Sequence, residues 1–461
     1  MDTVSTLMVL MASFDSAFTA PTAANVGVLL RGAVLAHGPR TVTGCMLAAW
    51  PWVTKHWSVY ANVPRRAKMD LHRLSWILFQ MILKLIPKDS VIELTVDESL
   101  VRRYGPRVVG VGMHRDAVRS PKGRNTATPG HKWVVLSVVV RLPYVQRALS
   151  LPLASALYTA KKHAKRNREK RPYNRHRTVG ELTKLLVRMV VRWAEDRRFR
   201  LIGDGAYGTH DLADAMNPQS KTYGLRQVTL LSRFRMDAAT YGPPPAYSGR
   251  GRPRKKGKRL PNPAAVAKSR WADWKDVVVD WYGGTRKTVR LCSRTGLWYK
   301  CGNQMKRVRW VLVRDPEGKR KDEVFFTTDM KLTPKQIVEA FVRRWSLETT
   351  FQELREHLGL ETLRNRTSQA VRRSVPLLMG VYSLVVVWFA RHVRNPKRYK
   401  QETPWYTKRS ITFSDMLAAA RQDILREILF IDSGSKTVEF FLQGLSQTPL
   451  DTSKEPIRRR A

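Results

Sequence analysis

Three acidic side chains lie where a carboxylate could bind a ligand. Asp97 ends the stretch 92–97, in which apolar and polar residues alternate as in a half-buried strand. Asp204 ends a second apolar stretch, and its neighbours Gly203 and Gly205 would let another group approach the backbone closely. Carboxylates at strand ends are where α/β folds place ligand-binding groups. Either aspartate alone could equally be a turn or cap residue, because Asx turns are common at strand ends.

The third carboxylate, Glu348, lies within a predicted helix that begins after Thr333-Pro334 and continues to Leu358. Residues at spacings of three and four share one face of this helix, namely Ile337, Phe341, Arg344, Glu348, Phe351, Arg355 and Leu358. The face is apolar at both ends but carries charged residues in its middle. It is therefore either a functional surface or the site of an ordinary i,i+4 ion pair between Arg344 and Glu348.

Carboxylates from three separate elements can together bind a pair of hard cations. Mg²⁺ prefers oxygen ligands and is typically held by one or two carboxylates and by substrate phosphates. Two such ions about 3.5–4 Å apart can activate the attacking oxygen and stabilise the leaving one in phosphodiester transfer. The sequence contains no HExxH, GxxxxGK[ST] or GxSxG motif that would indicate a competing chemistry.

The charge of the chain also indicates a polyanionic partner. Its 461 residues include 83 Lys and Arg against 37 Asp and Glu, a formal net charge of +46. This surplus argues against an enzyme of small-molecule metabolism and favours nucleic acid, with an anionic membrane surface second. Because 43% of the residues are apolar, the chain can still bury a core and is not wholly disordered. The charge is sparse before residue 60 and concentrated in 101–177, in 250–259 and around Glu348.

Membrane insertion and disulfide formation are not expected. The longest apolar run, 375–390, is shorter than the roughly 20 residues that span a bilayer, which favours a buried core helix. The N-terminus lacks the basic start of a signal peptide. Three cysteines, Cys45, Cys292 and Cys301, form neither a disulfide framework nor a zinc motif, which predicts a reducing compartment.

The pattern of elements predicts an α/β fold in five segments. Residues 1–90 are short helices, and 91–235 alternate strands and helices, with strands at 133–140, 199–202 and 227–234 and a helix at 179–195. Residues 236–332 contain a basic loop and a strand-rich insertion. The helix from Thr333 opens the segment 333–393, whose second helix covers 367–393. Residues 394–461 are a C-terminal helical region with a helix at 414–430.

With these residues in place, the chain resembles the DDE transposases of bacterial insertion sequences, specifically those with a Y-x2-R-x3-E-x6-K signature. Phe341, Arg344, Glu348 and Arg355 have these spacings, with Phe in place of Tyr and Arg in place of Lys. The segments LTVDES and LIGDGAYG resemble the family's first and second aspartate motifs. The resemblance covers residues 90–393. It implies an RNase H-like catalytic core interrupted by a β-strand-rich insertion, with an N-terminal helical domain and C-terminal helices.

The resemblance also implies an activity. Asp97, Asp204 and Glu348 would bind two Mg²⁺ ions, for which Mn²⁺ can substitute, and cut double-stranded DNA at the ends of a mobile element. The freed 3′-hydroxyl would attack target DNA. Arg344 and Arg355 would hold phosphates. The N-terminal helices would help to recognise the terminal repeats. Two paired ends imply a homodimer, and the expected location is the bacterial cytoplasm, at the nucleoid.

Trp345 has two interpretations. By the same resemblance it would stack on an extruded base. The alternative is an ordinary tryptophan buried in the core.

Two basic segments have less specific interpretations. Arg250 and Arg252 lie in an Arg-Gly-Arg-Pro sequence with the form of an AT-hook, which could enter a narrow minor groove. A non-specific phosphate-binding loop is the favoured alternative. The run 161–177 is predicted to contact phosphates, with a merely solvated face as its alternative.

Three hypotheses for the whole chain follow. The first is an active Mg²⁺-dependent transposase, and the second is a DNA-binding protein of transposase descent that no longer cuts. The third, a basic RNA-binding protein, leaves the spaced acidic signature unexplained. The presence of Asp97, Asp204 and Glu348 together favours the first.

Overall fold

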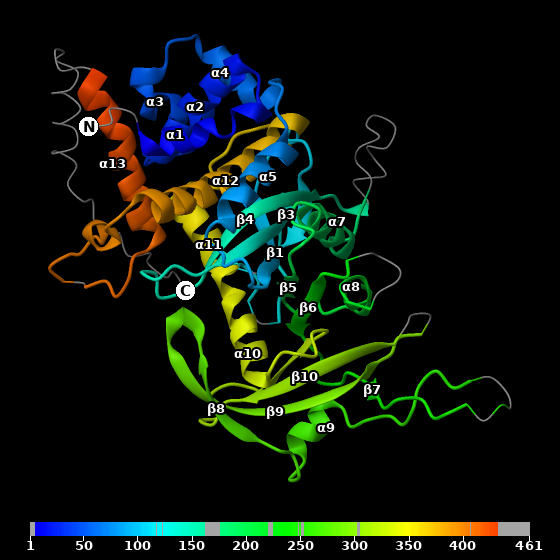
Figure 1. The fold of residues 1–461 in the computed structure, drawn as a ribbon. Helices are drawn as coiled ribbons and strands as arrows, with labels where there is room; N and C mark the ends of the chain where they lie inside the picture. The colour runs from blue at the N-terminus through cyan, green and yellow to red at the C-terminus, as the bar shows by residue number, and fades with distance from the viewer. Residues whose placement is uncertain are drawn as a thin grey trace.

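One mixed β-sheet runs through the protein, with helices packed around it (Figure 1). The computed structural model describes residues 5–116, 118–121, 123–161, 176–219, 225–247, 249, 253–301, 305–405 and 407–431. Their strands follow the order β2-β3-β1-β5-β6-β11-β10-β9-β7, with β4 added to β3 and β8 added to β9. The strand bounds are β1 Ile92–Arg102, β2 Gly112–Arg115, β3 Ala127–Val140, β4 Leu149–Tyr158, β5 Phe199–Gly203, β6 Val228–Arg233, β7 Thr240–Tyr241, β8 Lys275–Asp280, β9 Arg286–Trp298, β10 Lys306–Arg314 and β11 Glu323–Thr327.

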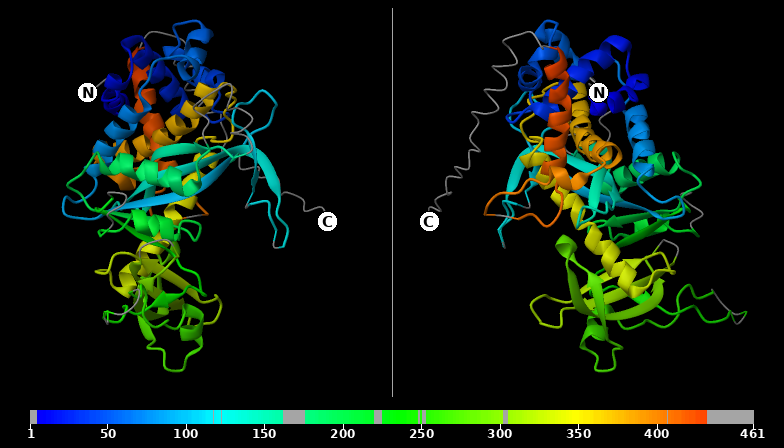
Figure 2. Two further views of the ribbon diagram at one scale, coloured as in Figure 1. Left: turned by 90° about the vertical axis from the view of Figure 1, so that its right-hand side faces the viewer. Right: turned by 60° about the vertical axis from the view of Figure 1, so that its left-hand side comes forward.

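The helices of the described residues gather mainly at one end of this sheet (Figures 1 and 2). Their bounds are α1 Thr6–Ala12, α2 Ala20–Leu35, α3 Val42–Ala48, α4 Trp57–Arg65, α5 Leu71–Leu83, α7 Val179–Val191, α8 His210–Ala215, α9 Pro263–Lys268, α10 Pro334–Arg343, α11 Trp345–Glu356, α12 Ser368–His392 and α13 Phe413–Ile431. The mixed sheet and its helices confirm the predicted α/β class.

The central strands arise from two sequence patterns. β1 follows the predicted alternation at Ile92, Glu93, Leu94, Val96 and Asp97, but not at Thr95, which is buried as well. It pairs antiparallel with β3 and parallel with β5. β3 is buried at every residue from Trp133 to Val140, and β5 is buried throughout, because strands inside a sheet are covered on both faces. β5 continues in parallel with β6. The sheet therefore brings the carboxyl end of β5 beside the middle of β1.

The strand-rich insertion extends the sheet as well as interrupting the chain. β11 pairs antiparallel with β6, and β10, β9 and β8 follow in turn. Figure 1 shows these strands as the lower part of the molecule, with α10 lying across them. Phe341 of α10 stacks on Phe325 of β11, with ring centroids 4.0 Å apart and planes at 24°. This contact anchors the helix that leads to the candidate site.

The predicted helix 333–358 is wrong in one respect, because it is broken at Arg344 into α10 and α11. The Ser346 hydroxyl donates to the Arg343 carbonyl across 2.7 Å, and the Leu347 amide donates to the Arg344 carbonyl, three residues back. A side-chain donor and a tight i→i−3 bond thus replace the regular ladder, a known cause of local helix distortion. The start of the helix is as predicted, since Thr333 and Gln336 form a capping box.

The N-terminal helices share a hydrophobic core with the sheet and with α12. Leu7 and Phe79 belong to the same buried cluster as Leu136 and Val385. α12 is long and apolar enough to cross a membrane by length and composition, but 67% of its most apolar window is buried inside the protein. It therefore serves as a core helix here, as predicted for the run 375–390. The boundaries of the five predicted segments stay predictions.

Candidate active site

The pairing of β1 with β5 sets the first two carboxylates side by side. Thr95 of β1 faces Ile202 of β5 in the parallel register. Continued by two residues, this register sets Asp97 opposite Asp204, which directly follows the last residue of β5. Asp97 therefore lies in the middle of β1, just beyond its last pair with β5, and Asp204 lies at the carboxyl end of β5. The two aspartates stand beside each other where the parallel pairing ends, the side of an α/β sheet that binds ligands.

Arg344 connects the third carboxylate to the first. Its Nη1 lies 3.0 Å from Asp97 Oδ2, and its Nη2 lies 2.7 Å from Glu348 Oε1. The Arg344 side chain is only 9% exposed. The ordinary i,i+4 ion pair between Arg344 and Glu348 is thus present. The same guanidinium also contacts Asp97, so it bridges α11 and β1. Asp97, Glu348 and Arg344 are brought together.

The electrostatics of the site follow from this crowding. Burial raises the pKa of Asp97 to about 7; Arg344 and the Glu98 amide oppose the rise, whereas Asp204 and Glu348 add to it. Burial alone would lower the pKa of Arg344, but the carboxylates of Asp97, Glu348 and Asp204 raise it above its ordinary value. The site therefore contains more negative charge than one guanidinium can balance.

Asp204 also makes the Asx turn that was its alternative interpretation. Its Oδ1 accepts from the Ala206 amide across 2.9 Å, and its carbonyl accepts from the Ser232 hydroxyl. Gly203 is required because a Cβ there would meet Tyr207 Cβ at 2.5 Å, so the group that approaches this glycine belongs to the chain itself. A Cβ at Gly205 would meet nothing closer than 3.9 Å. The close approach expected at Gly203 is thus made by Tyr207 of the same chain, whereas no described group approaches Gly205 closely.

Two buried polar atoms in this region have no hydrogen-bond partner among the described residues: Arg344 Nε and Tyr207 Oη. Tyr207 is fully buried, and burial raises its pKa well above the ordinary value, as do Glu98, Asp97 and Asp204 nearby. Buried polar atoms are normally paired, so unpaired ones indicate a position for a further polar group. Tyr207 is not among the residues predicted from the sequence, although it belongs to the LIGDGAYG segment.

The donor set fits a hard cation, but the present arrangement is centred on Arg344. Three carboxylates supply the oxygen ligands that Mg²⁺ prefers. Within the part of the chain that the structure describes, no three Asp, Glu, His or Cys side chains gather closely enough to hold one ion together. Asp97 and Glu348 instead share the guanidinium between them. A divalent metal could therefore bind these carboxylates only if Arg344 gave up its contact with Asp97 or with Glu348.

A buried polar chain fixes α11 to the sheet. Ser150 of β4 bonds to Thr95 across 3.0 Å and to Ser346 across 2.5 Å. Glu353, one turn beyond Glu348, accepts from Tyr382 of α12 across 2.7 Å and from Arg147 across 2.5 Å. These pairings were not predicted, because the partners are far apart in the chain and none of them is a defining position of the motifs.

Trp345 lies at the surface beside the site. It is 48% exposed, so the core interpretation is wrong, and its ring meets Tyr282 of the insertion edge-on at 5.6 Å. Both rings border a cavity of about 420 Å³. Its lining includes further cationic and aromatic side chains, namely Arg141, Arg147, Trp281, Arg286 and Arg343. Aromatic and arginine side chains around one cavity suit the stacking of a base and the contact of its phosphate.

The remaining predicted residues have different outcomes. Arg355 donates across 3.0 Å to Ser99, which lies two residues from Asp97 on β1. It also forms an ion pair with Glu361 at 3.3 Å. Arg250 and Arg252 lie outside the described residues, as does most of the run 161–177. The AT-hook and its phosphate-binding alternative therefore stay predictions.

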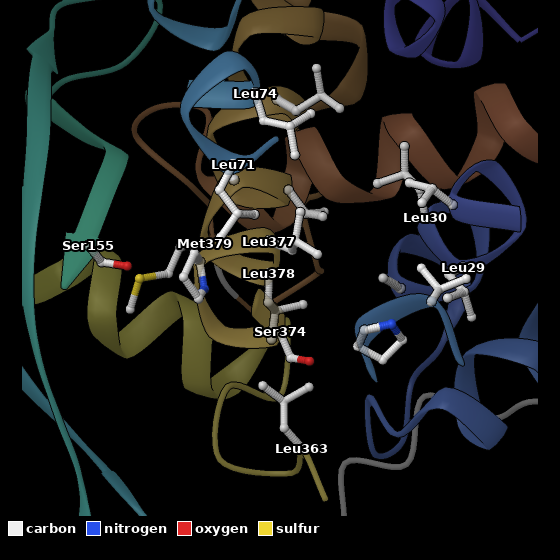
Figure 3. A pocket seen from close by; sticks show the side chains of 18 of the residues that line it. Leu29, Leu30, Leu71, Leu74, Ser155, Leu363, Ser374, Leu377, Leu378 and Met379 are labelled. Atoms are coloured by element: carbon white, nitrogen blue, oxygen red, sulfur yellow. The ribbon is translucent and has the colours of Figure 1, made fainter. Parts of the chain in front are cut away.

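A larger apolar cavity lies away from these residues. It has a volume of about 540 Å³ and is lined mainly by residues of α2, α5, α12 and β4. Figure 3 shows that leucines dominate its wall, including Leu29, Leu74 and Leu378, with the hydroxyls of Ser155 and Ser374 among them. The wall also includes Cys45 and His72, but it contains no carboxylate among its described residues.

A mixed sheet with one carboxylate within β1, one directly after β5 and a further carboxylate on the covering helix defines a candidate nuclease-type centre. The chain matches the family model of the DDE superfamily endonucleases over residues 13–288, more than half of its length, and therefore belongs to that family. The match includes Asp97 and Asp204 and ends before Glu348. No curated protein matches the chain. Membership agrees with an RNase H-like core and supports a nuclease or transposase type of enzyme with DNA as its substrate.

Proposed function

We propose that the protein is a divalent-metal-dependent DNA transposase that cleaves the ends of an insertion sequence of the Y-x2-R-x3-E-x6-K type and joins them to target DNA. The observation that carries this proposal is the convergence of Asp97, Asp204 and Glu348 from β1, β5 and α11 around Arg344. Carboxylates so arranged in a DDE-family chain have the chemistry needed for phosphodiester transfer.

In this function Asp97, Asp204 and Glu348 hold Mg²⁺ or Mn²⁺. The ions would supply an activated oxygen nucleophile and stabilise the leaving oxygen. The raised pKa of Asp97, about 7, is consistent with a carboxyl group that needs a stronger cationic partner than Arg344. Burial raises the pKa of Tyr207, to which Asp97 and Asp204 add, and its unpaired hydroxyl would orient a polar group bound beside the aspartates.

Arg344, Arg355 and Trp345 bind the DNA. When a DNA phosphate enters the site, the Arg344 guanidinium releases one of its two carboxylate partners and binds a phosphate oxygen instead. A guanidinium binds carboxylates and phosphates in the same forked geometry. Arg355 presents a second guanidinium along β1. Trp345 and the adjoining cavity accept a base at the cleaved end, and Tyr282 supports the indole ring. Phe341 cannot replace the family's tyrosine here, because its ring is buried against Phe325.

The assembly follows from the reaction. Two element ends must be held together, which calls for a homodimer on the DNA, in the cytoplasm at the bacterial nucleoid. The N-terminal helices would contribute to the recognition of the terminal repeats.

A cleavage assay tests the proposal. The substrate is a supercoiled plasmid that carries the coding sequence with its natural flanking DNA, incubated with purified protein and Mg²⁺. Asp97→Asn, Asp204→Asn and Glu348→Gln should each abolish strand cleavage and joining. Asp211→Asn on α8, an exposed carboxylate paired with Lys184, should leave both unchanged.

Cleavage by the three folded variants at the wild-type rate would overturn the site assignment. Binding by the wild type without cleavage in either Mg²⁺ or Mn²⁺ would instead identify a DNA-binding protein of transposase descent.

A further inference from the structure

The ribbon formed by β1, β2 and β3 extends beyond the rest of the sheet. β1 pairs with β5 only over Ile92–Thr95, whereas its pairing with β3 continues to Arg102. β2 then pairs with β3 up to Arg115. We call the described residues 103–130 the arm. In Figure 2 the arm projects from the body of the protein as a cyan ribbon.

The tip of the arm is held in one conformation by Asp116. This carboxylate is 2% exposed, and it accepts from Arg102 Nε at 2.9 Å and from the amides of Val118 and Arg119 at 3.1 and 3.3 Å. The Ser120 hydroxyl donates to the Asp116 carbonyl across 2.6 Å and accepts from the Thr126 amide across 3.0 Å. A loop ordered in advance loses less conformational entropy when it binds a partner.

The arm presents positive charge that nothing in it neutralises. Asp116 is the only acidic residue between positions 101 and 130, and its carboxylate is already engaged by Arg102. Arg107, Arg115, Arg119 and Arg124 are exposed, and no ion pair joins them to another described residue. Val118 stands between them at the tip and is 84% exposed. A projecting ribbon with exposed arginines is suited to the phosphates of a duplex, whose major groove admits two strands.

The arm is connected to the catalytic helix through a chain of ion pairs. Arg102 contacts Glu361 at 3.5 Å, and Glu361 contacts Arg355 of α11 at 3.3 Å. Arg355 in turn donates to Ser99, which lies two residues from Asp97 on β1. At about 3.3 Å per strand residue, Arg102 lies about 16 Å from Asp97, which corresponds to about 5 base pairs of DNA. The arm therefore begins where a duplex leaving the carboxylates would pass.

We infer that the arm is a second DNA-contact surface, which grips the backbone of the duplex being cleaved roughly 5–10 base pairs from the scissile phosphate. This inference rests on the proposed function, because it takes the element end as the duplex bound at Asp97. Arg119 and Arg124 contact phosphates on either side of the tip. Asp116 is a positioning residue that keeps both arginines turned outward.

Site-directed photo-crosslinking tests where the arm lies. The background is Cys301→Ser, because Cys301 is exposed whereas Cys45 and Cys292 are buried. Val118→Cys carries an aryl azide, and Leu185→Cys on α7, 42% exposed, is the matched control. Each protein is bound in EDTA to an end-labelled duplex that contains an element end with its flanking DNA, alongside a separate target duplex.

The azide at position 118 should crosslink to the element-end duplex roughly 5–10 base pairs from the cleavage position. Crosslinking no stronger than that of the position-185 control would overturn the inference, as would crosslinks confined to the separate target duplex.

Charge removal gives an independent readout. Arg119→Ala combined with Arg124→Ala should lower the slope of log binding constant against log salt concentration by about one unit per lost phosphate contact. The control is Arg192→Ala combined with Arg198→Ala. It removes the same charge at the other end of the strands. Arg198 directly precedes β5, whereas Asp204 directly follows it. The control should keep the wild-type slope.

Equal slopes for the two double variants, with unchanged thermal unfolding, would overturn the inference. Since binding is measured in EDTA, an enzyme that never cleaves but needs the arm would contradict only the proposed function. A cleaving enzyme whose binding ignores the arm would contradict only this inference.

Discussion

The Arg344 guanidinium donates to the Asp97 carboxylate across 3.0 Å, although the two residues are 247 positions apart in the sequence. The same guanidinium holds Glu348 at 2.7 Å. One cation thus connects the strand and the helix on which the proposed chemistry depends. It is also the group that a metal ion and a phosphate would both displace from the carboxylates.

Replacement of Arg344 should impair cleavage more than DNA binding. We expect Arg344→Ala to slow strand cleavage by roughly 10²-fold or more, as when a preorganised donor to a charged transition state is lost. Arg344→Lys should recover part of the rate, because it keeps the charge without the forked geometry. Single-turnover cleavage of an end-labelled duplex measures both, with Arg192→Ala as control. A wild-type rate for Arg344→Ala would contradict the role given to this bridge.

Removal of divalent metal should separate binding from chemistry. EDTA should abolish cleavage while leaving most of the DNA affinity, since the arginines that contact phosphates do not depend on a metal. Mg²⁺ or Mn²⁺ should restore cleavage, because both accept carboxylate ligands. Gel-shift and cleavage assays on the same samples provide the measurement. Persistent cleavage in EDTA would be incompatible with the proposed centre.

Trp345 should act on the DNA rather than on stability. Because its side chain is 48% exposed, Trp345→Ala should change the free energy of unfolding by no more than about 0.5 kcal/mol. Loss of a stacked base should weaken binding of the cleaved end by about 1–3 kcal/mol, and Trp345→Phe should retain part of it. Fluorescence of 2-aminopurine placed at the DNA end reports the extruded base. Trp271→Ala, 80% exposed on the insertion, is the control, and equal signals from both variants would refute stacking.

Tyr382→Phe should destabilise the protein. The Tyr382 hydroxyl is fully buried and donates to Glu353, whose pKa is raised by burial and lowered in part by Arg147 and this bond. Removing the donor leaves a buried carboxylate with one partner fewer, at a cost of about 1–3 kcal/mol. Urea unfolding measures the change, with Tyr104→Phe at an exposed position as the control. Equal stability of the two variants would contradict this account of the polar chain.

Stability should fall in mild acid because of His131. Burial lowers the pKa of this imidazole to about 4, against the opposing effect of its 2.9 Å bond to the Val109 carbonyl. Between pH 6.5 and 4 the unfolded chain binds a proton that the folded chain does not, so the stability present above pH 6.5 is lost as the pH falls.

The loss should approach about 3 kcal/mol near pH 4. His131→Gln should flatten this part of the pH profile in urea unfolding. An unchanged profile in that variant would show that His131 is not the group responsible.

Local patterns were sufficient to place the three carboxylates on their elements. The alternation around Asp97 predicted a strand, and the spacing around Glu348 predicted a helical face. These patterns reflect the side-chain periods of strand and helix, which act within a few residues. The break at Arg344 escaped prediction because it depends on the Ser346 hydroxyl, whose choice of partner is not visible in the periodicity.

The arm escaped prediction for a similar reason. Residues 103–126 contain glycines, prolines and arginines without alternation, which is typical of a loop. The described residues of this segment are held by one buried carboxylate, Asp116, and by the pairing of β2 with β3. Such partners are chosen in three dimensions.

The sequence by itself determined the residue types of this protein, its net charge of +46 and the spacing that resembles a DDE signature. Tertiary structure alone decided that Asp97 stands beside Asp204, because the register of β1 with β5 depends on strands more than a hundred residues apart. It also decided that Arg344 serves two carboxylates and that Trp345 is exposed. Propensity is a local property, whereas burial and charge pairing depend on which distant segments the folded core brings into contact.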